Sequence, residues 1–593
     1  MKNFFIIYFL SITTGLFAQQ TPFEKSGGKE SATYFQAIEF YKNLDKQSPH
    51  ILLKEMGPTD AGYPLHLLLV SNDRKFDPAI WQKQNKVVIL INNGIHPGEP
   101  DGIDASMMLV RDINNYYKQK ERREKATGPI PINIKWKGLP DNVVLAIIPV
   151  YNIGGSLNRN SFSRVNQNGP LEYGFRGNAQ NLDLNRDFTK NDSKEAKSFA
   201  QIFHYLNPDI FIDNHVSDGA DYLHTMTLIT TQYDKLGADL GGWLKETFEP
   251  AIYKSMSNKK WDMIPYLEFE GGNIDKGMKQ FYDPPRYSSG YTALFQTIGF
   301  IPETHMLKPY KERVLSTYDL MRTMIEEASV HAIQLKTLRR KSIQEIKKEK
   351  AFPLAWKVDS AKHTLITFNG YEQAFKTSDA TGLQKMYYDR SKPFTKQLKF
   401  YNVYNPVNFI SKPEAYIIPQ GWWAVIDILK GNKVQMYQLL KDTAMEVEAY
   451  RIDDYKASPR PYEKHHKNGE VKVSATIKKI KFLKGDYYIP MNQSANRYIV
   501  EMLEPTGDDS FFAWNFFDAI LQQKEGYSDY RWEDVAAAYL KNNPELKQKL
   551  ETKKQGDSKF ANSDSAQLDF IYKNSPYYEP AHLRYPVFRV MSD

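Results

Sequence analysis

Apolar runs of strand length alternate with amphipathic stretches through the first 350 residues of the chain. The runs at 65–70, 86–92, 143–150, 209–215 and 297–305 are almost continuously apolar over most of their length. Between them, apolar residues recur at helical spacing over 33–44, 102–118, 193–206 and 240–256. A strand that is apolar on both faces needs helices on both faces of its sheet. The pattern therefore predicts an α/β/α sandwich around a largely parallel sheet.

The pattern changes after a helical stretch at about 311–350, which ends in the basic run 339–350. Short alternating segments separated by polar turns follow, and helices are expected after Phe511. These segments cover 363–368, 415–419, 422–429, 472–483 and 486–490. We therefore predict a first domain at 19–350 and a β-rich accessory domain with a helical tail at 351–593.

Length and charge bound the class of protein. The chain has 593 residues, well above the roughly 100–200 expected of one domain. Its net charge of +8 is small against 78 basic and 70 acidic residues, so neither nucleic acid nor an anionic membrane surface is an expected partner. No apolar run after the N-terminal one approaches about 18 residues, so no integral membrane segment is expected after residue 18.

The N-terminal residues 1–18 have the features of a secretory signal peptide: one Lys, an apolar run and small residues before Ala18. We expect export to the periplasm or the extracellular space. The chain contains no Cys, which suits an oxidising compartment and excludes a thiol nucleophile or a Cys-bound metal. A metal in this protein would have to be bound by His and carboxylate side chains.

Four polar features lie where predicted strands end. They are His96 with Glu99 three residues later, the segment 175–188, His215, and Glu303. Loops at strand ends are where sites assemble in open α/β sheets. A lone His-x-x-Glu is a weak signal, but two His and a carboxylate suit a catalytic zinc site, where three protein ligands leave one position open.

The chain contains, in this order, a His-x-x-Glu, an Asp-Leu-Asn-Arg-Asp-Phe, a strand-end His and a strand-end Glu. This series resembles the zinc carboxypeptidase family of metallopeptidases, over about residues 30–330. The resemblance implies the carboxypeptidase-like α/β/α sandwich around a mixed, mostly parallel sheet. It also implies one Zn²⁺ per chain, bound by His96, Glu99 and His215. Glu303 would be the general base that takes a proton from the attacking water.

Three further residues near the expected site follow from the resemblance. Asp183 matches the carboxylate that orients the first His ligand. Arg176, nine residues before Asn185, matches the arginine that stabilises the oxyanion in one subgroup. Arg164 is the competing candidate for that role.

Substrate contacts are implied by the same comparison. Asn185 and Arg186 correspond to the pair that binds the C-terminal carboxylate of the substrate, and a guanidinium is suited to a bidentate carboxylate contact. Tyr287 resembles the mobile tyrosine that closes over the substrate, with Tyr291 as the alternative.

The chain departs from the family pattern at 152–155, where the usual Asn-Pro-Asp-Gly reads Asn-Ile-Gly-Gly, and in its large C-terminal domain. The leading hypothesis is an exported zinc carboxypeptidase that acts on peptides with a free C-terminus. The alternatives are a zinc amidase or deacylase of the aspartoacylase type, and a non-catalytic binding protein on a peptidase scaffold. The sequence does not indicate the preferred C-terminal residue, whether the substrates are peptidoglycan or protein-derived peptides, or the oligomeric state.

Overall fold

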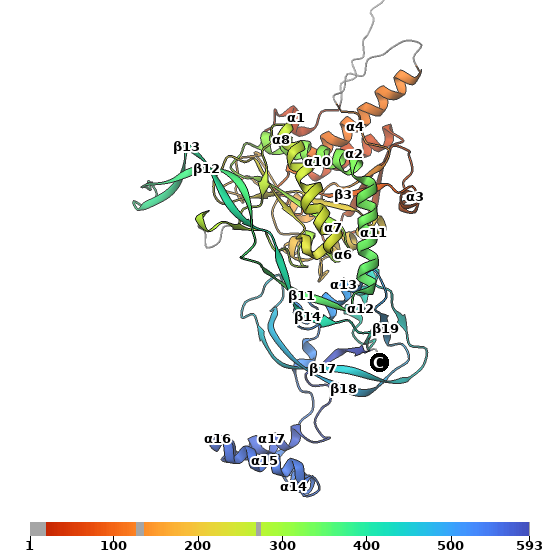
Figure 1. Cartoon of the computed structure of the whole chain (residues 1–593), viewed down its shortest axis with the longest axis vertical. Coiled ribbons are helices and arrows are strands. Elements are labelled where there is room, and N and C mark those ends of the chain that lie inside the picture. Colours follow the sequence, from red (N-terminus) through yellow and green to blue (C-terminus); the bar gives the residue numbers. More distant parts are fainter. Residues whose placement is uncertain (1–18, 126–135, 269–273, 592–593) are drawn as a thin grey trace, which may run out of the picture. The chain divides into compact units, whose positions relative to one another are not determined.

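The computed structural model describes residues 19–125, 136–268 and 274–591 (Figure 1). The expected signal peptide, residues 1–18, lies outside these residues. The chain forms two compact units. Unit 1 takes in the described residues up to Lys348 with 356–408 and 431–433, and unit 2 comprises 349–355, 409–430 and the described residues from Val434. The domain boundary expected near residue 350 stays a prediction.

Unit 1 is built on a mixed sheet, and the described residues supply nine strands to it. The central strands β4, β3, β5 and β10 run parallel, β6 pairs in parallel with β10, and β1, β2 and β7 add antiparallel pairings. The strands are β1 Ile51–Pro58, β2 Pro64–Val70, β3 Val87–Asn92, β4 Val143–Ile148, β5 Ile210–Asp213, β6 His215–Ser217, β7 Met226–Thr230, β8 Ile264–Pro265 and β10 Ile298–His305. The prediction of a mixed, mostly parallel sheet is confirmed.

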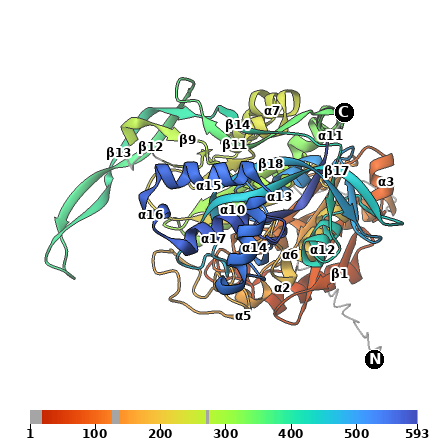
Figure 2. The same ribbon diagram turned by 90° about the horizontal axis from the view of Figure 1, so that it is seen from below.

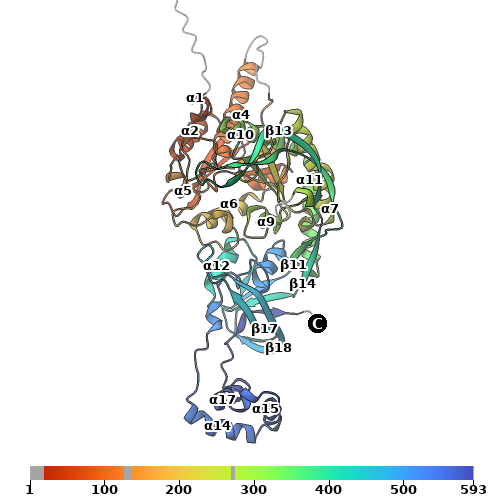
Figure 3. The same ribbon diagram turned by 90° about the vertical axis from the view of Figure 1, so that its left-hand side faces the viewer.

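Helices cover both faces of this sheet (Figures 1 and 3). Side chains alternate along β3, and Ile89 and Ile91 belong to the core that α4 and α10 complete on one face. On the other face, Phe211 of β5 packs edge-to-face on Phe199 of α6, with ring centroids 5.7 Å apart. The larger helices are α2 Tyr34–Gln47, α4 Asp101–Lys125, α6 Lys194–Leu206, α8 Glu249–Asn258, α10 Tyr310–Val330 and α11 Ala332–Lys348. The shorter ones are α1 Pro22–Lys25, α3 Pro78–Lys83, α5 Ile153–Leu157, α7 Ala238–Trp243 and α9 Ser288–Ala293.

A long antiparallel hairpin also belongs to unit 1 (Figure 2). Its strands are β12 Thr364–Thr377 and β13 Gln384–Tyr401, and β13 pairs with the short strand β9 Met278–Lys279. Phe368 of β12 and Leu398 and Phe400 of β13 are buried in a small cluster with Met278. The base of the hairpin is therefore held by apolar packing. Strand β11 Ala351–Val358 pairs with β14 Tyr404–Ser411 in a separate two-stranded sheet.

Unit 2 contains an antiparallel sheet in the order β16-β19-β15-β20-β17-β18. Its strands are β15 Ala415–Ile418, β16 Tyr437–Gln438, β17 Thr443–Ala457, β18 Asn468–Phe482, β19 Tyr487–Pro490 and β20 Arg584–Val590. Helices α13 Asn496–Leu503, α14 Asp529–Lys541, α15 Pro544–Gly556, α16 Ser558–Ala561 and α17 Asp564–Lys573 precede β20 in the chain. The prediction of a β-rich C-terminal region is confirmed.

One segment of this region was predicted wrongly. Residues 422–429 were expected to form a strand, but the structure has helix α12, Trp423–Gly431. Val425, Ile426, Ile428 and Leu429 are buried, and this spacing forms one stripe of a helix. Because the segment is almost continuously apolar, its sequence shows no clear helical period.

Within the described residues, no helix is both long and apolar enough to cross a membrane.

Candidate metal centre and substrate cavity

His96 and Glu99 lie in the loop that follows β3. The Glu99 N–H donates to the His96 carbonyl (2.9 Å), which closes a turn and brings both side chains to the same side. Gly98 lies in the turn, and a Cβ at this position would come within 2.5 Å of Arg164 Cδ and 3.1 Å of the Gly174 carbonyl. The glycine is therefore needed for the close approach of the segments that contain Arg164 and Gly174.

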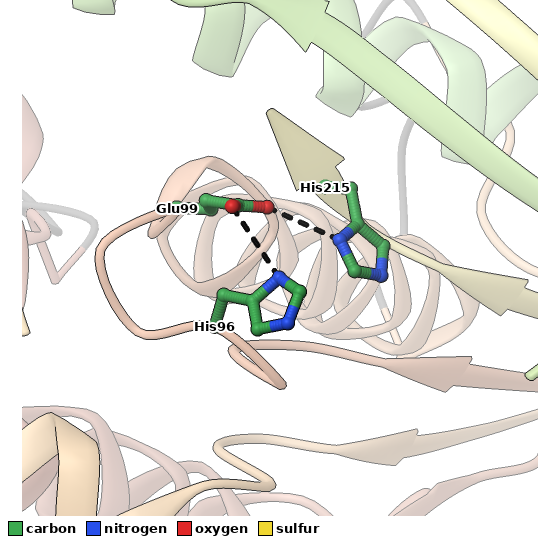
Figure 4. A group of neighbouring side chains, drawn as sticks. All are labelled: His96, Glu99 and His215. Carbon is green, nitrogen blue, oxygen red and sulfur yellow. Dashed lines mark hydrogen bonds and ion pairs between the residues drawn. The ribbon is translucent and has the colours of Figure 1, made fainter. Parts of the chain in front are cut away.

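His215 reaches the same point from a neighbouring strand. It begins β6, and Glu303 of β10 is its partner in the parallel register. Glu99 Oε1 lies 3.3 Å from His96 Nδ1, and Glu99 Oε2 lies 3.1 Å from His215 Nδ1 (Figure 4). One ligand atom from each of the three residues falls within 4.8 Å of the others, and all three residues are buried. The structure thus brings together the three residues expected to bind zinc.

The outer nitrogens of both imidazoles are held by carboxylates. His96 Nε2 is 2.9 Å from Asp183 Oδ1, and His215 Nε2 is 3.3 Å from Asp213 Oδ2. Asp213 is itself held by the Asn92 amide, which donates to its Oδ1 (3.0 Å). Such contacts fix the ring orientation and tautomer of a metal ligand. The sequence analysis missed Asp213, although its position two residues before a strand-end His was a usable signal.

The donor set fits a catalytic zinc ion. Two imidazole Nδ1 atoms and one carboxylate converge, and His96 Nδ1 makes no hydrogen bond within the described residues. Three protein ligands of this kind are typical of zinc sites that keep a position for water or substrate. Burial by itself would raise the pKa of Glu99, but Arg164 and His96 pull that pKa well below its ordinary range. Glu99 is therefore ionised, as a metal ligand must be.

Glu303 faces this group from β10. Its carboxyl lines the same cavity, and burial raises its pKa to about 8, with the charge of Glu99 adding to the rise. His215 and Arg164 oppose that rise by Coulomb attraction. A nearby cation would favour the carboxylate further, because opposite charges lower the pKa of an acid.

Both candidate arginines lie at the site. Arg176 makes a two-pronged contact with Asp183 Oδ2, through Nε at 2.9 Å and the second guanidinium nitrogen at 2.8 Å, and its side chain is 45% exposed. Arg164 donates to Glu99 Oε1 (2.8 Å) and to Gln167 (2.7 Å), and its side chain is 15% exposed. Arg164 is thus fixed on Glu99, whereas Arg176 is fixed on Asp183 and is the more exposed of the two side chains.

Asn185 and Arg186 lie in a short 3₁₀ turn capped by Asp183, whose Oδ1 accepts the Asn185 N–H (2.9 Å). The buried Oδ1 of Asn185 makes no hydrogen bond within the described residues. The Arg186 guanidinium lies 4.2 Å from the ring centroid of Tyr287. Both Arg186 and Tyr287 line the cavity, whereas Tyr291 is fully buried and packs against Phe203 and Phe295.

The three expected zinc ligands, Glu303, the two arginines, Asn185, Arg186 and Tyr287 line one cavity of about 460 Å³. Its lining comprises His96, Glu99, Ser163, Arg164, Val165, Asn166, Arg176, Asn185, Arg186, His215, Val216, Ser217, Asp218, Ile229, Tyr266, Phe281, Tyr287, Ile301, Glu303 and Met306. The apolar members, such as Tyr266 and Phe281, were not found by the sequence analysis because nothing in their local sequence marks them. Every lining residue precedes residue 307, so the cavity lies entirely within unit 1.

The chain is similar to known carboxypeptidases. Residues 37–230 match the family model described as zinc carboxypeptidase. Carboxypeptidase 2 of Trichophyton rubrum is 20% identical over 515 residues, which cover 82% of this chain and 84% of that protein. Carboxypeptidase 2 of Trichophyton tonsurans is 20% identical over 455 residues, or 72% and 73% of the two chains. A solved metallo-carboxypeptidase from Burkholderia cenocepacia aligns with a TM-score of 0.36 and 16% identity, over 51% of this chain and 70% of that one.

These matches define the class of the protein, a metallopeptidase. The chain contains a zinc carboxypeptidase domain, matched over residues 37–230. The matched segment contains His96, Glu99 and His215 and ends before Glu303.

Proposed function

We propose that this protein is an exported zinc carboxypeptidase that removes residues from the C-terminus of peptides. The observation that carries the proposal is a single cavity that contains the His–Glu–His group, Glu303, and the Asn185–Arg186 pair. A metal centre with a carboxylate beside it suits amide hydrolysis, and a guanidinium in the same cavity suits a substrate that ends in a carboxylate.

His96, Glu99 and His215 would hold one Zn²⁺ per chain. Zinc bound there supplies a Lewis acid that polarises the scissile carbonyl and lowers the pKa of water towards about 7. Asp183 and Asp213 keep the two imidazoles in the ring orientation that directs Nδ1 inwards.

Glu303 would act as the general base. Its carboxylate accepts a proton from the attacking water and passes that proton to the leaving amine. Arg176 would stabilise the negative charge that develops on the carbonyl oxygen, since a fixed guanidinium in a partly dehydrated cavity is an effective donor to an oxyanion. Arg164 would keep Glu99 in place through its 2.8 Å contact.

Asn185 and Arg186 would bind the α-carboxylate of the substrate, and Tyr287 would cover it. The Arg186 guanidinium lies 4.2 Å from the Tyr287 ring centroid, so a carboxylate bound to Arg186 lies beside that ring. This contact distinguishes an exopeptidase from an enzyme that cleaves any exposed amide.

The experiment compares one peptide with its own C-terminal amide. The acid should be cleaved about 30- to 1000-fold better in kcat/KM, because losing a hydrogen bond to a charged group costs about 2–4 kcal/mol at 1.36 kcal/mol per tenfold. Arg186→Ala should slow the acid and leave the amide almost unchanged. Equal cleavage of both peptides by the wild type would indicate an endopeptidase or a deacylase, and no cleavage of either would indicate a binding protein.

Export is supported by the pattern of residues 1–18 and by the absence of Cys. Signal cleavage should leave Gln19 as the first residue of the mature chain. N-terminal sequencing of protein recovered from outside the cytoplasm tests this, and a mature chain that begins at Met1 would contradict it.

We also propose that residues 351–593 supply no group to the site, and that those of them outside 356–408 and 431–433, which belong to unit 1, form a separate domain. All lining residues of the cavity precede residue 307. Limited proteolysis should cut first near the basic stretch 339–350. A metal content or turnover that depends on a side chain beyond residue 351 would overturn the proposal.

A further inference from the structure

One wall of the cavity carries no charge. Ile229, Tyr266, Phe281, Tyr287 and Ile301 supply it, and they come from four separate segments of the chain. The two isoleucines are almost fully buried, whereas the three aromatic residues are only partly buried. Partly buried rings that face a cavity are surfaces that a ligand can still cover.

The isoleucines form the floor beside the proposed catalytic group. Ile301 precedes Glu303 by two residues on β10, and residues two apart on a strand point to the same face of the sheet. Ile229 of β7 is the antiparallel partner of Ile301. The apolar floor therefore begins directly next to the carboxylate that we propose as the general base.

The aromatic residues form a continuous chain that ends at Arg186. Tyr266 and Phe281 pack edge-to-face with centroids 5.9 Å apart, and Phe281 and Tyr287 do the same at 5.7 Å. The Arg186 guanidinium follows at 4.2 Å from the Tyr287 ring. In an amino acid, the side chain leaves the carbon next to the carboxylate. When the C-terminal carboxylate of a peptide binds Arg186, the side chain of that C-terminal residue therefore lies against this wall.

Acidic groups act on the Tyr266 end of this wall: burial raises the pKa of Tyr266, and the charges of Glu303, Asp218 and Glu268 add to the rise. Glu99 and Glu303 belong to the reacting end, and Asp218 lies on an exposed segment after β6. Asp283 lies near Arg186, but it is buried outside the lining, where it accepts the Ser289 hydroxyl and the Gly290 N–H. A basic C-terminal side chain placed against Phe281 and Tyr287 would lose water and lie near the Arg186 and Arg286 guanidiniums, which disfavours it.

We propose that the enzyme selects peptides whose C-terminal residue is large and apolar, aromatic or branched aliphatic, and that the wall of Ile229, Tyr266, Phe281, Tyr287 and Ile301 receives that side chain. The selection rests on the proposed carboxypeptidase function, because it requires the α-carboxylate on Arg186.

A series of N-acylated dipeptides that differ only in the C-terminal residue tests the selection. From the free energy of burying a large apolar side chain, kcat/KM for C-terminal Phe should exceed that for Ala by about 10- to 150-fold. C-terminal Lys and Glu should be poorer than Ala. If Lys or Ala is cleaved as well as Phe, the selection is wrong while the carboxypeptidase function stands. If no dipeptide is cleaved, the proposed function itself fails.

Variants then assign the selection to the wall. Phe281→Ala should lower the Phe-to-Ala ratio of kcat/KM about tenfold through the Phe substrate, since each removed contact acts on that side chain only. Phe295→Ala is the matched control, because Phe295 is also partly buried and edge-packed but lies outside the cavity lining. It should leave the ratio unchanged.

A second measurement is independent of turnover. Free L-Phe should protect the zinc-loaded Glu303→Gln variant from thermal unfolding more than L-Lys does at equal concentration, and Phe281→Ala in that background should remove the difference. A Phe281→Ala protein that slows all substrates equally and binds L-Phe normally would overturn the assignment.

Discussion

The two ends of the cavity are built in opposite ways. At the reacting end, each expected zinc ligand has a charged partner: Asp183 contacts His96, Asp213 contacts His215, and Arg164 contacts Glu99. At the apolar wall, Tyr266, Phe281 and Tyr287 meet through ring contacts. Buried charges are costly unless they are paired, so the reacting end has few alternative arrangements.

We therefore expect the reacting end to determine the rate of the reaction and the apolar wall to determine which substrates are cleaved. A change at the reacting end leaves a buried charge or imidazole without its partner and should affect every substrate alike. A change at the wall removes contact area and should affect only substrates whose side chain reaches it. The predictions below test this separation, starting with the largest expected effect.

Removing the two histidines should abolish both metal binding and turnover. His96→Ala with His215→Ala leaves Glu99 as the only ligand, which is too few for a stable zinc site. Elemental analysis after gel filtration should find near-stoichiometric zinc in the wild type and little in the double variant. A His363→Ala, His466→Ala variant removes two imidazoles from exposed positions and should keep the metal. A metal-bearing His96, His215 double variant would place the site elsewhere.

Glu303→Gln should keep zinc and lose turnover. The change is nearly isosteric and removes only the basic carboxylate, so kcat should fall by about 10²- to 10⁴-fold for all substrates. Steady-state kinetics and metal analysis on the same sample measure both quantities. Glu312→Gln, at an exposed position on α10, is the control. Retention of more than about a tenth of the wild-type rate would exclude Glu303 as the base.

Substitution of the two arginines should have different effects. Arg176→Gln should lower kcat by about 10²- to 10³-fold, as expected for loss of an oxyanion donor, and its loss of stability should be the smaller of the two because Asp183 keeps His96 as a partner. Arg164→Gln should instead lower thermal stability, because it removes a fixed partner of the buried Glu99. Kinetics and thermal unfolding of both variants decide the assignment. The reverse pattern would make Arg164 the oxyanion residue.

The smallest effect should come from the carboxylates behind the histidines. Asp183→Asn and Asp213→Asn should each weaken zinc affinity by about 10- to 100-fold, because the imidazole loses the group that orients it. Competition with a chelator of known affinity measures this. Asp218→Asn changes an exposed carboxylate on the segment after His215 and should leave the affinity unchanged. If the Asp213 variant binds zinc as tightly as the wild type, the 3.3 Å contact between Asp213 and His215 does not orient the imidazole for the metal.

Much of the fold could be predicted because its information is local. The apolar runs that become β3, β4, β5 and β10 are continuous, so a sheet covered on both faces followed directly from them. The segment 422–429 shows the limit of this reasoning. A short apolar run has no clear period, and only burial of Val425, Ile426, Ile428 and Leu429 on one stripe identifies it as a helix.

The sequence by itself determined the groups that lie close together in the chain. The His96–Glu99 turn sets one half of the expected metal centre through a 2.9 Å backbone hydrogen bond. The Asp183–Asn185 turn is equally local, with a side chain that caps its own backbone two residues on. Short-range geometry of this kind needs no knowledge of the rest of the fold.

Only the tertiary structure decided the rest of the site. It placed Tyr287 in the cavity and Tyr291 in the core, and it brought both Arg164 and Arg176 to the centre. The apolar wall is the clearest case, since Ile229 and Ile301 become neighbours only when β7 pairs with β10. A surface assembled from distant segments leaves no motif in any one of them, because each residue is specified by its neighbours in space and not by its neighbours in sequence.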